Sequence, residues 1–95
     1  MLESKIQAQV TKYLKSIGCK VIKIVTASVA GHADLVICYK GLYVEFEMKQ
    51  PGKHAKPLQI AKGKETMLAD GFWFVIHSLE EAKAAIAEIE LGIED

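Results

Sequence analysis

The segment GLYVEFEMKQP, residues 41–51, carries charged side chains in a spacing that could support chemistry. If the segment is a β-strand, its alternating residues place an apolar set on one face and Glu45, Glu47 and Lys49 on the other. The simplest interpretation is a half-exposed strand of an antiparallel sheet whose polar face is solvated. The alternative is a functional cluster, and the choice depends on which residues the fold brings beside Glu47.

A short turn at Lys40-Gly41 predicts that residues 34–49 form a β-hairpin. Folding back at this turn brings Asp34, at the start of one strand, to the 47–49 region at the end of the other. Two carboxylates at the same end of a hairpin repel each other unless a cation lies between them. The hairpin therefore predicts a cation beside Asp34 and Glu47.

Phosphodiester hydrolysis is one reaction that uses such a set. It needs a divalent metal held by hard oxygen ligands, which activates a water and offsets the charge that develops on phosphorus. It also benefits from a positive side chain near the attacking water or the non-bridging oxygens, a role that Lys49 could fill.

Glu3 is a further acidic residue in an unusual place. Residues 2–17 predict an amphipathic helix that ends at Gly18, and Glu3 falls on the same stripe as its apolar residues. A carboxylate on a core-facing stripe is costly unless a cation meets it. A capping box between Ser4 and Gln7 would instead leave Glu3 outside the helix, and the spacing alone favours neither interpretation.

The remaining patterns predict an α/β order of helix, strand, strand, strand, helix, strand, helix. Residues 19–26 are β-branched and predict a strand, and the uniformly apolar run 72–76 predicts a strand buried on both faces. A helix is expected from Pro57 to about Asp70, closed by Gly71, and its apolar positions are Leu58, Ala61, Met67 and Leu68. The last helix is expected to begin with a Ser78–Glu81 capping box and to bury Ala82, Ala85, Ile86 and Ile89.

Composition predicts a single domain over residues 1–95 with an uneven charge distribution. Residues 1–64 hold eleven lysines and four acids, a difference of plus seven, whereas residues 65–95 hold one lysine and eight acids, a difference of minus seven. The larger part of the chain thus suits a polyanion. Every basic residue other than histidine is lysine, which favours contacts to phosphates and shape over guanidinium readout of guanine.

The sequence shows no signal peptide and no apolar run long enough to span a bilayer, so no membrane partner is expected. Cys19 and Cys38 lack metal-type spacing and lie in apolar, strand-like segments. They are expected to be buried free thiols in a reducing compartment, which favours a cytoplasmic protein.

The motifs GHAD (31–34) and EMK (47–49) resemble the signature of the PD-(D/E)xK nucleases. The ordered set of Glu3, Gly31-x-x-Asp34, Glu47-x-Lys49 and Gln59 resembles more specifically the VRR-NUC family, the virus-type replication-repair nuclease module. The similarity extends from Glu3 to about Ile76, and it implies a viral or bacterial origin. It implies an α/β, restriction-endonuclease-like core of order αβββαβα, in which a mixed sheet is flanked by helices.

The resemblance implies a metal site for Mg²⁺, for which Mn²⁺ is expected to substitute, and no organic cofactor. Asp34 and Glu47 would be the ligands, with the main-chain carbonyl of Met48 as a third. Glu3 would reach the same site from the first helix, directly or through water, and this implication favours the functional interpretation of its position.

The resemblance also implies that Lys49 polarises the attacking water and that Gln59 positions this water or a phosphate. One departure from the family pattern is Ala33, where proline usually precedes the first aspartate. Because only the aspartate carboxylate binds metal, this departure leaves the predicted site intact.

A nucleic-acid-binding surface is predicted around the mobile loop that follows Lys49. Its candidate residues are Lys49, Lys53, His54, Lys56, Lys62 and Lys64. His32 is interpreted as a bystander, and Glu45 as the partner of a neighbouring lysine in a salt bridge rather than a metal ligand. Trp73 and its phenylalanine neighbours are interpreted as core rather than as a base-stacking platform.

Together these features predict a Mg²⁺-dependent DNA endonuclease that acts on branched DNA such as Holliday junctions or flaps in replication, recombination or repair. A resolvase cuts two strands symmetrically, so a homodimer is expected, with the apolar surface of the first or last helix as its interface. The alternatives are a sequence-specific restriction-type endonuclease, a non-catalytic nucleic-acid-binding module of the same fold, and an adaptor that binds proteins through its acidic last helix.

Overall fold

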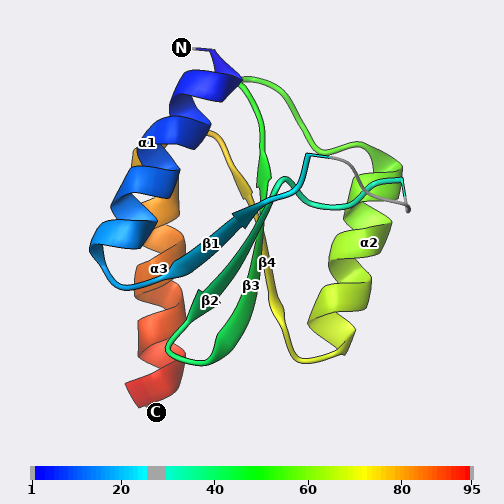
Figure 1. The fold of residues 1–95 in the computed structure, drawn as a ribbon. Coiled ribbons are helices and arrows are strands. Elements are labelled where there is room, and N and C mark those ends of the chain that lie inside the picture. Colours follow the sequence, from blue (N-terminus) through cyan, green and yellow to red (C-terminus); the bar gives the residue numbers. More distant parts are fainter. Residues whose placement is uncertain (1, 26–29, 95) are drawn as a thin grey trace.

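The computed structural model describes residues 2–25 and 30–94 of the 95-residue chain. Its elements follow the predicted order: α1 (Glu3–Ser16), β1 (Lys20–Lys23), β2 (Leu35–Tyr39), β3 (Leu42–Met48), α2 (Pro57–Leu68), β4 (Phe72–Ile76) and α3 (Leu79–Glu94). A four-stranded sheet lies between helices α1 and α3 on one face and α2 on the other (Figure 1). The predicted α/β architecture of a mixed sheet flanked by helices is confirmed.

The sheet has the strand order β1-β2-β3-β4, in which β1, β2 and β3 are antiparallel and β4 is parallel to β3. The predicted hairpin is confirmed, and its register pairs Leu35 with Phe46. Lys40 and Gly41 have φ angles of 50° and 80°, the left-handed conformation that a tight hairpin turn needs at both central positions. This topology brings the start of β2 and the carboxyl ends of β3 and β4 to one edge of the sheet.

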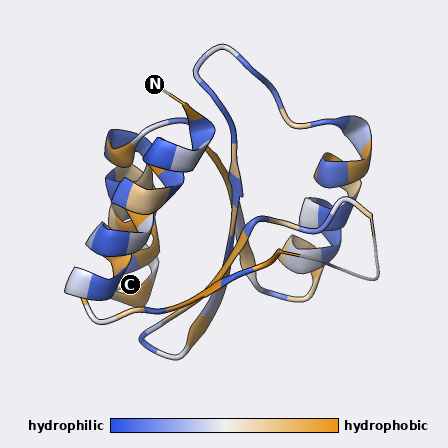
Figure 2. Ribbon diagram, turned by 45° about the horizontal axis from the view of Figure 1, so that its top comes forward, coloured by the Kyte–Doolittle hydropathy of each residue, from blue (hydrophilic) through white to orange (hydrophobic). Residues whose placement is uncertain are grey.

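The main core lies between the sheet and the α1/α3 layer. The predicted stripes of the first and last helices are buried there, and Phe46 and Phe74 meet edge to face with 6.0 Å between ring centroids. Figure 2 shows both hydrophobic and hydrophilic residues along the sheet strands, while the connection from β3 to α2 is mainly hydrophilic. The large apolar side chains that are fully buried are Ile6, Val10, Leu14, Leu35, Ile37, Val44, Phe46, Met48, Ile76 and Ile89.

The second layer, between α2 and the sheet, is thinner and less apolar. The predicted apolar positions of α2 do not form a core stripe, because Leu58, Met67 and Leu68 are 48%, 46% and 86% exposed. The buried residue of α2 is Gly63, which rests on the indole of Trp73. A Cβ at this position would lie 2.2 Å from Trp73 Cδ2, so glycine is what allows α2 to approach the sheet.

The N-terminal predictions need two corrections. The capping box of Ser4 with Gln7 is not formed: α1 begins at Glu3 itself, after Leu2, and no side chain caps it. The first strand ends at Lys23 rather than at residue 26, and Thr26 lies outside the described residues.

The predicted cap of the last helix is confirmed in part. Ser78 Oγ accepts a hydrogen bond from the Glu81 amide at 3.1 Å, as a capping serine should. The Glu81 carboxylate, however, accepts from the amide of His77 rather than returning to Ser78.

The prediction that both cysteines are buried is wrong for Cys38. Cys19 is buried beside α1, whereas Cys38 is exposed. Cys38 alternates with the buried residues of β2 and so lies on the face away from the α1/α3 core. None of the helices in residues 2–25 and 30–94 is long and apolar enough to cross a membrane.

Candidate active site

Asp34 and β3 are joined at the open end of the hairpin. Oδ2 of Asp34 accepts a hydrogen bond from the Met48 amide at 2.8 Å. β2 begins one residue later at Leu35, so Asp34 continues the hairpin register and lies across from Glu47. The structure thus brings together the two carboxylates that the sequence analysis paired.

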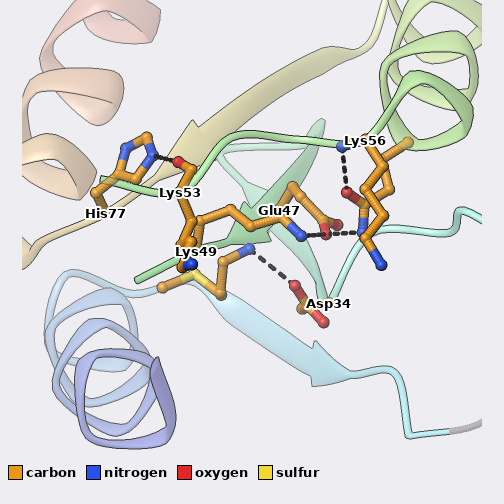
Figure 3. Close-up of polar contacts among 8 residues, drawn as sticks. Asp34, Glu47, Lys49, Lys53, Lys56 and His77 are labelled. Carbon is orange, nitrogen blue, oxygen red and sulfur yellow. Dashed lines mark hydrogen bonds and ion pairs between the residues drawn. The ribbon is translucent and has the colours of Figure 1, made fainter. Parts of the chain in front are cut away.

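Glu47 is 2% exposed, which is unusual for a carboxylate. Its Oε1 accepts a hydrogen bond from Gln59 Nε2 at 2.6 Å and lies 3.6 Å from the Lys49 ammonium (Figure 3). Its Oε2 is buried and accepts no hydrogen bond from the described part of the chain. The interpretation of this strand face as simply solvated is therefore wrong, because α2 and the connection before it cover the end of β3.

Burial raises the pKa of Glu47 to about 7, and the negative charge of Asp34 acts in the same direction. Lys49 lowers it, and the charge of Glu3 raises it by a smaller contribution. A carboxyl group with this pKa exchanges its proton near neutral pH. The proton and any cation bound at this position therefore compete for Glu47.

Gln59 is held in one orientation by two partners. Its Oε1 accepts from the Lys56 amide at 2.7 Å, at the start of α2, which leaves its Nε2 to donate to Glu47. The main-chain donor fixes which end of the amide faces Glu47. Gln59 therefore orients the carboxylate directly.

The Met48 carbonyl is directed toward the same region. The Lys49 amide donates to Ile76 on β4, so the Met48 amide points to the opposite side, toward Asp34. In an extended strand the N–H and C=O groups of one residue point the same way. The carbonyl predicted as a third oxygen ligand thus faces the side of β3 on which Asp34 lies.

The residues present fit a divalent cation. A buried carboxylate oxygen without a donor, a second carboxylate across the hairpin and a main-chain carbonyl are the hard oxygen ligands that Mg²⁺ prefers. In residues 2–25 and 30–94, no group of three or more His, Cys, Asp or Glu side chains is arranged to hold a metal ion. Glu3 is half-buried at the start of α1, and its predicted role at the site stays a prediction.

The predicted DNA-contacting residues occupy two different settings. Lys53, His54 and Lys56 are exposed on the connection between β3 and α2, next to the carboxylates. Lys64 is exposed on α2, whereas Lys62 is half-buried and forms an ion pair with Glu65 at 3.2 Å. These basic side chains of the connection are thus all exposed, whereas one of the two on α2 is half-buried and paired.

Glu45 has a different role from the predicted salt bridge with lysine. Its two oxygens accept hydrogen bonds from the Tyr43 and Thr66 hydroxyls, each at 2.6 Å. Burial raises the pKa of Tyr43 to about 12, and the bond to Glu45 adds to this shift. Glu45 therefore ties β3 to α2, at the base of a cavity of about 570 Å³.

Trp73 and His32 line the same cavity. Phe72 and Phe74 pack on the main core as predicted, but Trp73 is half-buried in the layer under α2. His32 is exposed, and its Nδ1 lies 3.0 Å from the carbonyl oxygen of Ala33.

His77 is a residue of this region that the sequence analysis missed. It follows β4 directly, and its Nε2 lies 2.7 Å from the carbonyl oxygen of Lys53 on the β3–α2 connection (Figure 3). The signal was available: residues that follow two neighbouring parallel strands emerge at the same edge of a sheet. Lys49 follows β3 and His77 follows β4.

The strand order, the flanking helices and the carboxylates at the open end of the hairpin define an α/β, nuclease-like fold. A solved structure described as "VRR_NUC domain" has this fold, with a TM-score of 0.79 over 90% of this chain and 94% of that one. The two sequences are 20% identical, so the likeness establishes the fold. No family model matches the sequence, and no curated protein does. The VRR-NUC resemblance read from the motifs is thus confirmed at the level of the fold.

Proposed function

We propose that this protein is a metal-dependent DNA endonuclease that hydrolyses phosphodiester bonds, with a preference for branched or otherwise structured DNA. The observation that carries the proposal is Glu47 Oε2, a buried carboxylate oxygen without a donor in the described chain, beside the charge of Asp34. A fold has little reason to bury this arrangement unless a cation binds there. The VRR-NUC fold supports the same conclusion.

Asp34, Glu47 and the Met48 carbonyl would hold Mg²⁺ or Mn²⁺, with Glu3 contributing directly or through water. The cation would favour deprotonation of the attacking water and offset the negative charge that develops on the phosphate oxygens. These ligands include Glu47 Oε2, which has no hydrogen-bond partner in the described part of the chain. They also include the Met48 carbonyl, which faces the side of β3 on which Asp34 lies.

Lys49 supplies the fixed positive charge of the reaction. Its ammonium group lies 3.6 Å from Glu47 Oε1 and its side chain is 14% exposed, so it is held close to the carboxylate. In the proposed reaction it orients the water, which gives up a proton to solvent as its oxygen bonds to phosphorus and the bond from phosphorus to the 3′ oxygen breaks. The leaving oxygen takes a proton, which gives a 3′-hydroxyl and a 5′-phosphate. Gln59 keeps Glu47 in place during the attack of the water and the departure of the 3′ oxygen.

The proposed substrate preference rests on the basic residues. Lysine side chains bind phosphates as flexible point charges and carry little information on base sequence. Lys53, His54 and Lys56 extend from the connection beside the carboxylates and are exposed. Recognition through phosphates favours the shape of the DNA over its sequence, which supports a junction or flap as substrate rather than a restriction site.

The test is cleavage of synthetic four-way junctions, flaps and linear duplexes in Mg²⁺, Mn²⁺ or EDTA. We expect metal-dependent cuts in branched DNA, abolished by Asp34→Asn and lowered by Lys49→Ala by at least about a hundredfold in kcat. Glu88→Gln, on the exposed side of α3, is the matched control and should retain full activity. Calorimetry should show Mg²⁺ binding by the parent and none by Asp34→Asn.

Each failure has a defined meaning. If linear duplexes are cut at one short sequence as efficiently as branched DNA is cut, the restriction-type alternative would be established. DNA binding that weakens with salt, without cleavage or metal binding, would establish a non-catalytic module. Absence of both DNA binding and metal binding would overturn the proposal and favour the adaptor.

A homodimer is part of the proposal, because a four-way junction presents two equivalent strands. Exposed apolar side chains that could meet a second copy include Leu91 and Ile93 near the end of α3, and Leu58 and Leu68 on α2. Sedimentation of the free protein and of its complex with a junction measures the stoichiometry directly. A single copy on the junction would contradict this part.

A further inference from the structure

The β3–α2 connection, residues 49–56, is held to the rest of the fold at three places. At its start the Lys49 amide donates to Ile76, and at its end the Lys56 amide donates to Gln59. Between these points, one hydrogen bond in the described part of the chain joins the connection to another element. It runs from the His77 ring to the Lys53 carbonyl. The placement of the middle of the connection, with Lys53, thus depends on one imidazole ring.

Both ring nitrogens of His77 face hydrogen-bond acceptors. Nε2 lies 2.7 Å from the Lys53 carbonyl oxygen, and Nδ1 lies 2.8 Å from Glu81 Oε1. A carbonyl and a carboxylate accept but do not donate, and a neutral imidazole carries a single N–H. Only the doubly protonated ring satisfies both contacts, so the geometry selects the cation.

The Glu81 carboxylate is placed to stabilise that cation. Glu81 lies in the first turn of α3, and its Oε1 also accepts from the His77 main-chain amide at 2.9 Å, which fixes it against the ring. The bond to Glu81 and the Lys53 carbonyl raise the pKa of His77 above its ordinary value, while burial opposes them. Two groups thus face the His77 ring: the charged Glu81 carboxylate from α3 and the Lys53 carbonyl from the connection.

We propose that His77 is a positioning residue: its imidazolium ties the β3–α2 connection to the start of α3 and so holds Lys53 in place for the DNA backbone. The DNA half of this inference rests on the proposed function, whereas the tether itself does not. In the described part of the chain no hydrogen bond joins His77 to a candidate metal ligand, and its action passes through the main chain of Lys53.

The direction of the pH dependence follows from the sign of the shift. A histidine whose pKa is raised by folding contributes stabilisation that is complete below its ordinary pKa of about 6.5 and is lost as pH rises through the raised value. The connection should therefore be tied at low pH and released at higher pH. Glu47 also titrates in this range, so a variant must separate the two groups.

Glu81→Gln separates the titration of His77 from that of Glu47. Its amide oxygen can still accept from the His77 ring, but the negative charge that favours the imidazolium is gone. Glu80→Gln is the matched control, since it makes the same change in the same turn of α3 on an exposed side chain. His77→Ala removes the tether and leaves the titration of Glu47 unchanged.

The first experiment needs no DNA. We expect NMR titration to show the His77 ring titrating above the ordinary histidine pKa in the parent and in Glu80→Gln, and lower in Glu81→Gln. Amide exchange over residues 50–55, measured below the His77 pKa, should be about threefold to tenfold faster in His77→Ala. A ring that titrates normally, or equal exchange in parent and His77→Ala, would overturn the tether.

The second experiment measures KM and kcat for a branched substrate against pH. As pH rises through the His77 pKa, KM of the parent should rise about threefold to tenfold, while the pH profile of kcat should be the same in the parent and in His77→Ala. This rise should move to lower pH in Glu81→Gln and vanish in His77→Ala. A KM profile identical in all variants would overturn the DNA half. Absence of cleavage and DNA binding in every variant, with the exchange result intact, would instead locate the failure in the proposed function.

Discussion

Glu47 is the residue on which the candidate site depends. It is nearly fully buried, a like charge lies across the hairpin, and Gln59 and Lys49 both act on Oε1. Two donors on one oxygen and none on the other leave the carboxylate half satisfied. Such a group costs stability unless it is protonated or binds a cation, which links its charge state to metal binding.

This link gives a prediction for Glu47→Gln in metal-free protein. The pKa of Glu47 is raised from 4.5 to about 7, so the wild-type protein loses stability as pH rises between these values and remains penalised above them. A glutamine is neutral throughout. At pH 8 we expect Glu47→Gln to raise the free energy of unfolding by roughly 2 kcal/mol, less than the full shift because its amide nitrogen is buried without an acceptor.

Urea unfolding at several pH values measures this difference, which should shrink as pH falls and reverse in sign below about pH 5, because the cost of the unpaired amide does not depend on pH. Added Mg²⁺ should stabilise the parent and not Glu47→Gln. Glu88→Gln, exposed on α3, controls for the change in net charge. Parallel pH profiles for parent and Glu47→Gln would show that Glu47 is an ordinary carboxylate.

Gln59 has a separate prediction, because it touches the candidate metal ligand but holds no metal itself. Without its amide donor the Glu47 anion loses a hydrogen bond, so its pKa rises further and the proton competes better with Mg²⁺. Gln59→Ala should lower Mg²⁺ affinity at pH 7 about tenfold, the usual effect of removing a partner of a ligand.

Raising the pH should recover most of the Mg²⁺ affinity that Gln59→Ala loses, because proton competition then falls away. Calorimetry at two pH values tests this recovery. Gln9→Ala, an exposed glutamine on α1, should bind Mg²⁺ like the parent. A loss in Gln59→Ala that does not depend on pH would mean that Gln59 acts by some other route.

At the scale of elements, α2 decides whether the polar face of β3 is solvated or buried. It approaches the sheet through Gly63, which lies on the Trp73 ring, and adds Thr66 to Glu45 and Gln59 to Glu47. Gln59 and Thr66 lie seven positions apart, two turns along one helix face, with Gly63 between them, and thus cover the two carboxylates. The helix packs by polar and small contacts rather than by an apolar stripe.

Gly63→Ala tests this packing. The new methyl carbon would lie 2.2 Å from Trp73 Cδ2, so α2 must move outward. We expect a loss of about 2 kcal/mol in the free energy of unfolding, despite the higher helix propensity of alanine. The shift should also move Gln59 from Glu47 and weaken Mg²⁺ binding.

Gly92→Ala is the control, since a Cβ there meets nothing within 4 Å and the residue is also helical. It should be neutral or gain up to about 1 kcal/mol. Thermal denaturation of both variants makes the comparison. A Gly63→Ala protein as stable as Gly92→Ala would mean that the contact with Trp73 does not limit the approach of α2.

The same contrast explains how far the sequence predicts this fold. Period-3.6 stripes on α1 and α3 and the Lys40-Gly41 turn are local signals, and they placed the main core and brought Asp34 to Glu47. The burial of Glu45 and Glu47 depends on α2, whose contacts use glycine, threonine and glutamine and carry no hydrophobic period. Its exposed leucines therefore predicted the wrong face.

At the scale of the whole molecule, the candidate site depends on three segments distant in sequence that meet at one edge of the sheet. The antiparallel hairpin supplies Asp34 and Glu47, and the parallel crossover through α2 adds His77 beside the connection. The exposed basic residues of the connection lie at this edge. α3, on the face of the sheet opposite α2, carries the exposed acids Glu80, Glu81 and Glu88, of which Glu81 adjoins the connection through His77.

This distribution predicts which lysines set the salt dependence of DNA binding. Each phosphate that a lysine neutralises contributes about 0.9 to the slope of log affinity against log salt concentration on duplex DNA. Lys53→Ala combined with Lys56→Ala should therefore lower that slope by roughly 2, and should do so equally for junctions and duplexes.

Lys20→Ala is the matched control. Lys20 is exposed in β1 opposite Cys38, near the other end of β2 from Asp34, and its loss should leave the slope unchanged. Fluorescence anisotropy in Ca²⁺, which supports metal binding without requiring turnover, measures both slopes. An equal fall for Lys20→Ala would mean that DNA senses only the overall charge of the protein, because a surface confined to the edge beside Glu47 cannot respond to a lysine at the opposite end.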